Sequence, residues 1–261
     1  VRAVFSIQNV QPGYYKEYWN EREGVIMIID GETCIGCEAC LECCPVGAIG
    51  MEDEKAEIDQ DLCAECGNCF RSEVCPVDAI TRNELVWPRT IRNIFSDPLS
   101  VFQETGVSGR GTEESKTNDV TKRFRKGEVG FAIDVGRPNA GGVRLREVEK
   151  ICRELSKLNV AYDPDNPLTY LMEDLKTGTL KEEVLDEFVV SAIIEFKTPL
   201  EKCVGVVKTL ENVSHQIDTV FSVGVISRVE DDGTIPAAQI LGGEGFHLRP
   251  NGKTTLNLGR T

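Results

Sequence analysis

The stretch IDGETCIGCEACLECCPVGAI, residues 29–49, returns as IDQDLCAECGNCFRSEVCPVDAI at residues 58–80. The first cysteines of the two copies, Cys34 and Cys63, are 29 positions apart. Each copy is typical of a short strand, a cysteine-rich loop, a one-turn helix after Cys-Pro and a return strand. A unit of this size buries little apolar surface, so we expect bound metal to hold it folded.

The cysteine spacing in the first copy is Cys34-x2-Cys37-x2-Cys40-x3-Cys44-Pro45, the run that binds [4Fe-4S] clusters in bacterial proteins. In a tandem pair of such runs, the fourth cysteine binds the other cluster. Zinc is the alternative for thiolate ligands, but a zinc site would use two Cys-x2-Cys pairs and would not need the third cysteine or the Cys-Pro. We therefore predict two [4Fe-4S] clusters, cluster I held by Cys34, Cys37, Cys40 and Cys75, and cluster II held by Cys63, Cys66, Cys69 and Cys44.

The sequence departs from this pattern in two places. Five residues separate Cys69 from Cys75 where three are usual, which predicts an enlarged loop over Phe70–Val74 beside cluster I. Cys43 is an additional thiol next to Cys44. It is either an inert neighbour of the cluster, a ligand in a shifted register or a redox-active thiol.

The composition favours a protein of a reducing compartment. Nine of the 11 cysteines lie between Cys34 and Cys75, and the segment Val1–Tyr15 lacks the pattern of an export signal. No apolar stretch approaches the roughly 18 residues of a membrane span. The formal net charge of -14 argues against a nucleic-acid binder. We therefore expect a soluble, cytoplasmic protein with no membrane span and no nucleic-acid partner.

The organisation that we predict has four parts. An N-terminal segment covers residues 1–23, the two-cluster domain covers 24–83, a connector covers 84–127, and an α+β sandwich domain covers 128–261. The connector carries a basic patch, formed by Arg110, Lys116, Lys122, Arg123, Arg125 and Lys126. This patch is either a solvated linker or a binding segment for a small anionic ligand or a partner.

The pattern of the last part is that of alternating strands and helices. Alternation over residues 129–135 predicts a half-buried strand. Thr198, Pro199 and Glu201 have the spacing of a capping box at a helix start. With strands over residues 189–196 and 219–229, and one more within 159–180, the fold class would be α+β with a split βαβ arrangement. Two apolar stripes mark the helices, one formed by Leu145, Val148, Cys152 and Leu155 and the other by Leu200, Cys203, Val207 and Leu210.

The remaining cysteines, glycine-rich runs and histidines do not indicate a second functional site. Cys152 and Cys203 lie on the helix stripes, where free cysteine packs as a small hydrophobe. Gly252-Lys253-Thr254 lacks the first glycine of a P-loop, and the run 242–245 is typical of a turn between strands. His215 and His247 have no partner at a catalytic spacing. The catalytic residues, if there are any, stay unknown.

Residues 24–83 resemble the two-[4Fe-4S] ferredoxins of the bacterial type, and this resemblance implies electron transfer through the eight cysteines named above. The run TGVSGRGTEESKTNDVTKRF, residues 105–124, followed by FAIDVGRP at 131–138, resembles the ferredoxin-bearing part of 6-hydroxynicotinate reductase-like proteins. Those proteins combine iron-sulfur centres with flavin. This chain shows no flavin fingerprint, so a flavin would belong to a partner.

Three functions remain open at this point. The chain could be an electron-transfer subunit that passes low-potential electrons to a partner reductase docked on residues 128–261. It could be the iron-sulfur component of a 6-hydroxynicotinate reductase-like oxidoreductase with a small-molecule site in the C-terminal domain. It could also be a regulatory protein in which the C-terminal domain senses a ligand.

Overall fold

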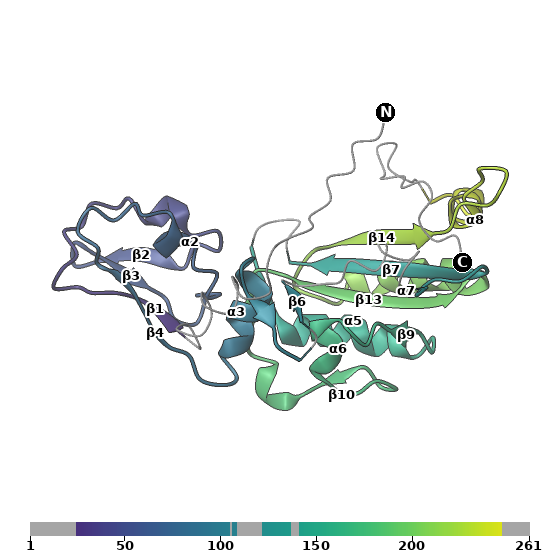
Figure 1. Cartoon of the computed structure of the whole chain (residues 1–261), viewed down its shortest axis with the longest axis horizontal. Coiled ribbons are helices and arrows are strands. Elements are labelled where there is room, and N and C mark those ends of the chain that lie inside the picture. The colour runs from purple at the N-terminus through teal and green to yellow at the C-terminus, as the bar shows by residue number, and fades with distance from the viewer. Residues whose placement is uncertain (1–24, 105, 109–121, 137–140, 247–261) are drawn as a thin grey trace, which may run out of the picture.

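The computed structural model describes residues 25–104, 106–108, 122–136 and 141–246. Within these ranges the chain forms two regions, each with its own apolar cluster. A small cysteine-rich region and a larger region of sheet and helices lie side by side, with helix α3 (Thr90–Ser96) between them (Figure 1). The described chain thus has mixed helix and strand content with small sheets.

The cysteine-rich region repeats one unit twice. The first copy runs through β1 (Val25–Ile29), the 3-10 turn η1 (Leu41–Cys43) and β2 (Ile49–Glu52). The second runs through β3 (Lys55–Ile58), α2 (Asn68–Arg71) and β4 (Ile80–Glu84). β1 pairs antiparallel with β4, and β2 pairs antiparallel with β3. The first strand of each copy therefore pairs with the last strand of the other.

The one-turn helices stand before Cys-Pro, and the prediction that they follow it is wrong. η1 ends at Cys43 and α2 ends at Arg71. After Cys-Pro the chain makes a single turn, closed by hydrogen bonds from Gly47 N to Cys44 O and from Asp78 N to Cys75 O. That turn then leads directly into β2 or β4.

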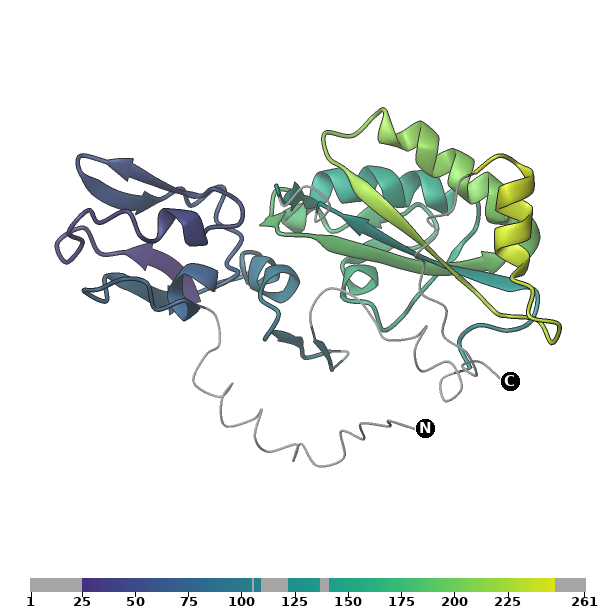
Figure 2. The same cartoon turned by 90° about the horizontal axis from the view of Figure 1, so that it is seen from above.

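The larger region contains a four-stranded antiparallel sheet in the order β14-β7-β13-β9. Helices α5 and α7 lie on the same side of this sheet (Figure 2). The predicted alternation is confirmed, because the side chains of Val129, Phe131, Ile133 and Val135 are fully buried. The elements named here are β7 (Glu128–Val135), α5 (Leu145–Ser156), β9 (Ala161–Tyr162), β13 (Ala192–Pro199), α7 (Cys203–Ser214) and β14 (Phe221–Ser227).

Short elements complete the larger region and the segment that leads to it. Three two-stranded sheets pair β5 with β6, β8 with β12 and β10 with β11. Their bounds, with those of the remaining helices, are β5 (Val101–Phe102), β6 (Val107–Ser108), β8 (Val143–Arg144), α6 (Pro167–Tyr170), β10 (Met172–Asp174), β11 (Thr179–Leu180), η3 (Glu182–Val184), β12 (Phe188–Val189), η4 (Leu200–Lys202) and α8 (Pro236–Gly243).

The capping box predicted at Thr198 does not form. β13 continues through Pro199, a 3-10 turn follows, and α7 begins at Cys203. Thr198 is 3% exposed and belongs to the inward-facing residues of β13, opposite Val129. Within the described ranges its Oγ1 has no hydrogen-bond partner. The strand pairing therefore determines the conformation of Thr198, in preference to the local cap.

The segment expected to be a connector contributes to the larger core. Ile91 and Phe95 of α3 are 0% and 1% exposed, and both pack in the apolar cluster of the sheet region. The opposite side of α3 faces the cysteine-rich region. No helix within the described ranges is long and apolar enough to cross a lipid bilayer.

Candidate metal centres

The first hollow in the cysteine-rich region contains four thiols. Cys34, Cys37, Cys40 and Cys75 line it, three from the first copy and one from the second. Apolar side chains complete its wall, among them Ile29, Ile35, Ala56, Val77, Ala79 and Ile80. We call this space hollow I. The structure thus brings together the four residues predicted for cluster I.

A second hollow of the same kind lies in the same region. Cys63, Cys66 and Cys69 line it together with Cys44 from the first copy. Cys43 lines it as well, so five thiols surround this space, which we call hollow II. Each hollow measures about 310 Å³ when the open space at its mouth is included.

Backbone amides donate to the sulfurs that cross between the copies. Ala48 N donates to Cys44 Sγ at 3.1 Å, and Ala79 N donates to Cys75 Sγ at 3.2 Å. Both bonds span four residues and lie in the turn after Cys-Pro. The crossing sulfur of each copy therefore accepts a backbone hydrogen bond at the same position of its turn.

The environment of the thiols differs between the hollows. Burial raises the pKa of the Cys63 thiol to about 12 and that of the Cys69 thiol to about 11. Burial raises the pKa of Cys66 as well. In hollow I, burial raises the pKa of Cys40, whereas a hydrogen bond from the backbone of Ala56 lowers the pKa of Cys34. Metal binding in hollow II therefore has to displace protons that these thiols hold tightly.

The donor set fits iron-sulfur clusters. Each hollow offers four soft thiols in an apolar wall, the surroundings in which four cysteine thiolates bind a cubane. No three Cys, His, Asp or Glu side chains within the described ranges converge on the position of one metal ion. The thiols of a cubane site stand around a group of four irons, and a hollow lined by four cysteines provides that space.

The predicted enlarged loop, Phe70–Val74, begins within a helical turn. Residues 68–71 make α2 where the first copy has a 3-10 turn. Arg71 at its end donates to the carbonyl of Cys66 at 2.7 Å and forms an ion pair with Asp97 at 2.8 Å. The enlarged loop therefore supplies a cation that ties hollow II to the segment after α3.

Helix α3 supplies further contacts that sequence reasoning missed. Arg92 donates to the carbonyls of Gln60, Asp61 and Cys63 at 2.9–3.0 Å, and its Nε donates to Glu187 at 2.5 Å. The residue is 5% exposed. Because Glu187 lies 95 positions further along the chain, no local pattern reveals this pair.

A second arginine at the start of α3 acts on the same loop. Arg89 donates to Glu65 and to both carbonyl oxygens of Gln60, the backbone one and the side-chain one, at 2.7–2.9 Å. Glu65 is 2% exposed and also accepts a hydrogen bond from Met27 N. Together Arg89 and Arg92 hold the loop of residues 60–65 against α3.

The basic patch of the sequence is only partly described. Arg110 and Lys116 lie outside the described residues. Arg123 forms ion pairs with Asp163 and Asp165, and Lys126 forms one with Glu230 at 3.1 Å. Arg123 and Lys126 are therefore paired with carboxylates of the sheet region. No contact within the described ranges indicates a separate anionic ligand.

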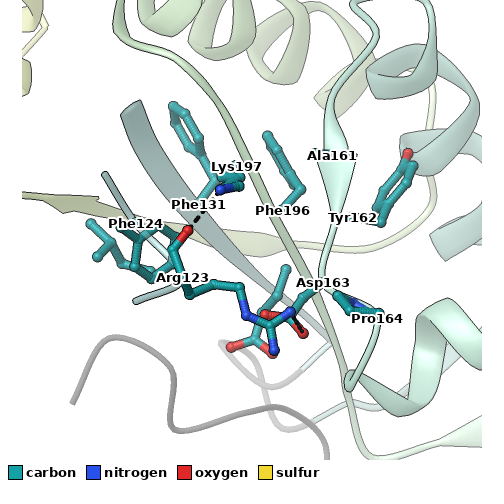
Figure 3. A pocket seen from close by; sticks show the side chains of 11 residues that line it. Arg123, Phe124, Phe131, Ala161, Tyr162, Asp163, Pro164, Phe196 and Lys197 are labelled. Atoms are coloured by element: carbon teal, nitrogen blue, oxygen red, sulfur yellow. Dashed lines mark hydrogen bonds and ion pairs between the residues drawn. The ribbon is translucent and has the colours of Figure 1, made fainter. Parts of the chain in front are cut away.

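Arg123 also borders a pocket on the sheet. Its guanidinium points to Asp163 and its carbonyl accepts a hydrogen bond from Lys197 at 2.7 Å (Figure 3). Phe124 closes the pocket by packing on Gly130, where a Cβ atom would lie 2.3 Å from its ring. Lys197 pairs in turn with Glu128 at 2.9 Å. The charges at this pocket are thus paired within the chain.

The helix cysteines lie in the core as the sequence predicts. Cys152 on α5 and Cys203 on α7 are both fully buried. Burial raises the pKa of both thiols. They lie in the large apolar cluster, apart from the thiols of the two hollows.

Comparison with known proteins assigns the cysteine-rich region. A family model described as a 4Fe-4S dicluster domain matches residues 26–76. Together, the paired hollows and this match define an iron-sulfur protein with a ferredoxin-like electron-transfer function.

Individual relatives support the assignment of the cysteine-rich region to the ferredoxins. The chain is 33% identical to ferredoxin Fdx2 of Sorangium cellulosum over 99 residues, 36% of this chain and 94% of that protein. It is 47% identical to pyruvate synthase subunit PorD of Methanocaldococcus jannaschii over 57 residues, 21% of this chain and 63% of PorD. It is 49% identical to a subunit of the ion-translocating oxidoreductase complex of Methanosarcina acetivorans over 47 residues, 18% of this chain and 17% of that subunit. The chain therefore spans less than two thirds of the length of the last two relatives.

Because the chain covers almost the whole of a ferredoxin at this identity, it belongs to the 4Fe-4S dicluster ferredoxin family. These three similarities cover 18%, 21% and 36% of the chain, so each describes a part of it rather than the whole.

Proposed function

We propose that this chain is an electron-transfer subunit that takes up low-potential electrons and passes them to a partner reductase. Cys34, Cys37, Cys40 and Cys75 would hold one [4Fe-4S] cluster, and Cys44, Cys63, Cys66 and Cys69 the other. The observation that carries the proposal is the division of these eight thiols between two hollows, each completed by the cysteine that precedes proline in the other copy. When bound, such a cluster accepts and donates single electrons.

The chain's own residues prepare both sites. The amides of Ala48 and Ala79 donate to ligand sulfurs, and hydrogen bonds to sulfur are one of the factors that set the potential. Apolar side chains such as Ile29, Ile58 and Ile80 line the hollows and limit access of water. Since free thiols persist under reducing conditions, the cytoplasm is the compartment that we propose.

For the sheet region we propose a split βαβ sandwich that docks the catalytic partner. The strand order β14-β7-β13-β9, antiparallel throughout, and the placement of α5 and α7 on one side support this arrangement. Two relatives, PorD and the protein from the ion-translocating complex, are named as subunits of larger enzymes, which supports a partner of the oxidoreductase class.

The other two functions considered from the sequence are not proposed. Much of the 6-hydroxynicotinate reductase-like stretch, residues 109–121 and 137–138, lies outside the described residues. No contact within the described ranges favours that reductase, a flavin or a ligand-sensing role over electron transfer.

Anaerobic purification and metal analysis test the proposal. We expect about eight irons per chain, a visible absorbance that falls on reduction with dithionite, and the EPR signal of reduced [4Fe-4S] clusters. Reoxidation should restore the absorbance. Stoichiometric zinc in place of iron, or iron that cannot be reversibly reduced, would contradict electron transfer by this chain.

A further inference from the structure

The two cysteine loops arise from a repeat, so their equivalent positions can be compared directly. In the first loop Ile35 is 61% exposed, whereas its counterpart Ala64 is 1% exposed. Cys37 is exposed, whereas its counterpart Cys66 is half-buried. The repeat alone would give both loops the same exposure, so another part of the chain must cover the second loop.

That cover is helix α3. Arg92 donates to three carbonyls of the second loop, and Asn93 Nδ2 donates to the carbonyl of Glu65 at 3.0 Å. The corresponding contact to the first loop comes from within the cysteine-rich region, where Lys55 of β3 donates to the carbonyl of Cys34. β1 runs away from α3, and the loop that follows it lies at the far end of the molecule (Figure 1 and Figure 2).

The exposed loop has an apolar centre above hollow I. Ile35 lines hollow I together with Cys37 and Glu38. The β2–β3 hairpin lies against the same loop, because a Cβ atom on Gly36 would lie 2.2 Å from the carbonyl of Glu54 and 3.8 Å from Met51 Cε. Met51 is itself 37% exposed. Ile35, on this loop, and Met51, on the hairpin against it, are both exposed, and we call these two side chains the apolar centre.

The stretch of chain that carries this centre is strongly acidic. Residues 30–57 contain eight acidic residues and one lysine, and all eight acidic residues are exposed. Glu38 follows Cys37 directly, and Asp53 and Glu54 form the hairpin turn beside Gly36. The surface thus combines a small apolar centre with the exposed carboxylates of residues 30–57, which we call its acidic rim.

We propose that this surface, which we call the loop I face, is the docking site for a redox protein whose own docking face is basic around an apolar centre. The proposal rests on the electron-transfer function proposed above and names where an external partner exchanges electrons with the chain. Opposite charges accelerate and orient the encounter, and the apolar centre holds the partner over hollow I. The covered loop of hollow II faces the sheet region instead.

Electron transfer to cytochrome c, a basic haem protein, tests the docking site on the full, cluster-loaded chain. The clusters are first reduced with dithionite, and each transfer then oxidises one reduced cluster by one electron and reduces one ferric haem. The variant Glu32→Gln/Glu38→Gln/Glu54→Gln removes three charges of the rim. We expect its second-order rate at low ionic strength to fall about tenfold or more, with a weaker dependence on salt.

The matched control is Glu173→Gln/Glu182→Gln/Glu183→Gln, which removes three exposed charges from the sheet region. It changes the net charge equally and should keep the rate of the wild type within about twofold. A third variant, Ile35→Ala, should slow the reaction at low and at high salt alike, because it removes most of an apolar side chain from the docking surface without changing the charge. Iron content and absorbance are measured for every variant, and the rates are compared per loaded cluster, because Ile35 and Glu38 line hollow I.

The outcomes separate the two proposals. If both triple variants slow equally, or if the loop I triple variant keeps the wild-type rate while wild type reduces cytochrome c, the loop I face is not the docking site and the electron-transfer function stands. If loaded wild type transfers electrons neither to cytochrome c nor to ferricyanide, the proposed function fails, and the docking proposal fails with it.

Discussion

At the scale of single residues, the cysteine before each proline determines which thiols share a hollow. Cys75 lies with Cys34, Cys37 and Cys40, although it belongs to the other copy. We expect Cys75→Ala to lose the irons of hollow I, about four of eight, and to keep most of those in hollow II. Iron analysis and EPR after reduction measure both effects.

Cys43→Ser is the matched control, because Cys43 lines hollow II in addition to the four thiols that we propose as its ligands. We expect this variant to retain about eight irons. Cys75→Ala with a full iron complement would show that the ligand assignment is wrong. Loss of four irons in Cys43→Ser would show that Cys43 replaces Cys44.

The residue patterns predicted the sites better than their surroundings. Regular spacing identified the eight cysteines because the ligands of one loop are close in sequence. Arg92 was missed because its partners lie at Gln60–Cys63 and at Glu187, both far away along the chain. Thr198 was misread because a capping pattern is local, whereas burial of its side chain depends on pairing between β13 and β7.

At the scale of elements, α3 joins the two regions through a buried ion pair. Replacing Arg92 by Met leaves Glu187 buried without its cation and removes three donors from the second loop. We expect a loss of about 3 kcal/mol of stability, since breaking a buried pair on one side is costly. The midpoint of anaerobic urea unfolding, followed by circular dichroism, measures it.

The double variant Arg92→Met/Glu187→Met separates the charge from the carbonyl contacts. It should recover part of the lost stability, because no carboxylate is then buried alone, while the carbonyls of Gln60, Asp61 and Cys63 still lack their donor. A single Arg92→Met variant as stable as wild type would mean that this contact does not stabilise the chain.

The helices of the sheet region were predicted from the periodicity of their apolar residues. The stripe Leu145, Val148, Cys152 and Leu155 is fully buried on α5, as predicted. The stripe on α7 is shifted, with Val206 buried and Val207 only partly so. The reason is that the helix begins at Cys203, after a 3-10 turn that rotates its buried side relative to an α-helix starting at Pro199.

At the scale of the whole molecule, we expect the two regions to depend on iron to different degrees. The sheet region has a large apolar core that includes Phe131, Ile151 and Leu210, whereas the cysteine-rich cluster is built mostly from thiols and small side chains. Removing iron with an oxidant and a chelator should therefore expose the cysteine-rich region to protease while a resistant C-terminal fragment remains.

Mass spectrometry of the fragments checks this expectation, and iron-loaded protein is its control. We expect the first cuts between residues 25 and 84 in the iron-free chain only. Equal resistance of both regions without iron would mean that the cysteine-rich region folds on its own apolar contacts. Simultaneous loss of both would mean that the sheet region depends on its neighbour.

The pair of Arg92 and Glu187 also has a consequence for synthesis on the ribosome. The second cysteine loop is made first, but Arg92, which covers it, pairs with a carboxylate that is added 95 residues later. Until then α3 lacks the β12 segment against which it packs, and the second loop stays accessible. We therefore expect hollow II to stay open to cluster insertion until the C-terminal half of the chain has been made.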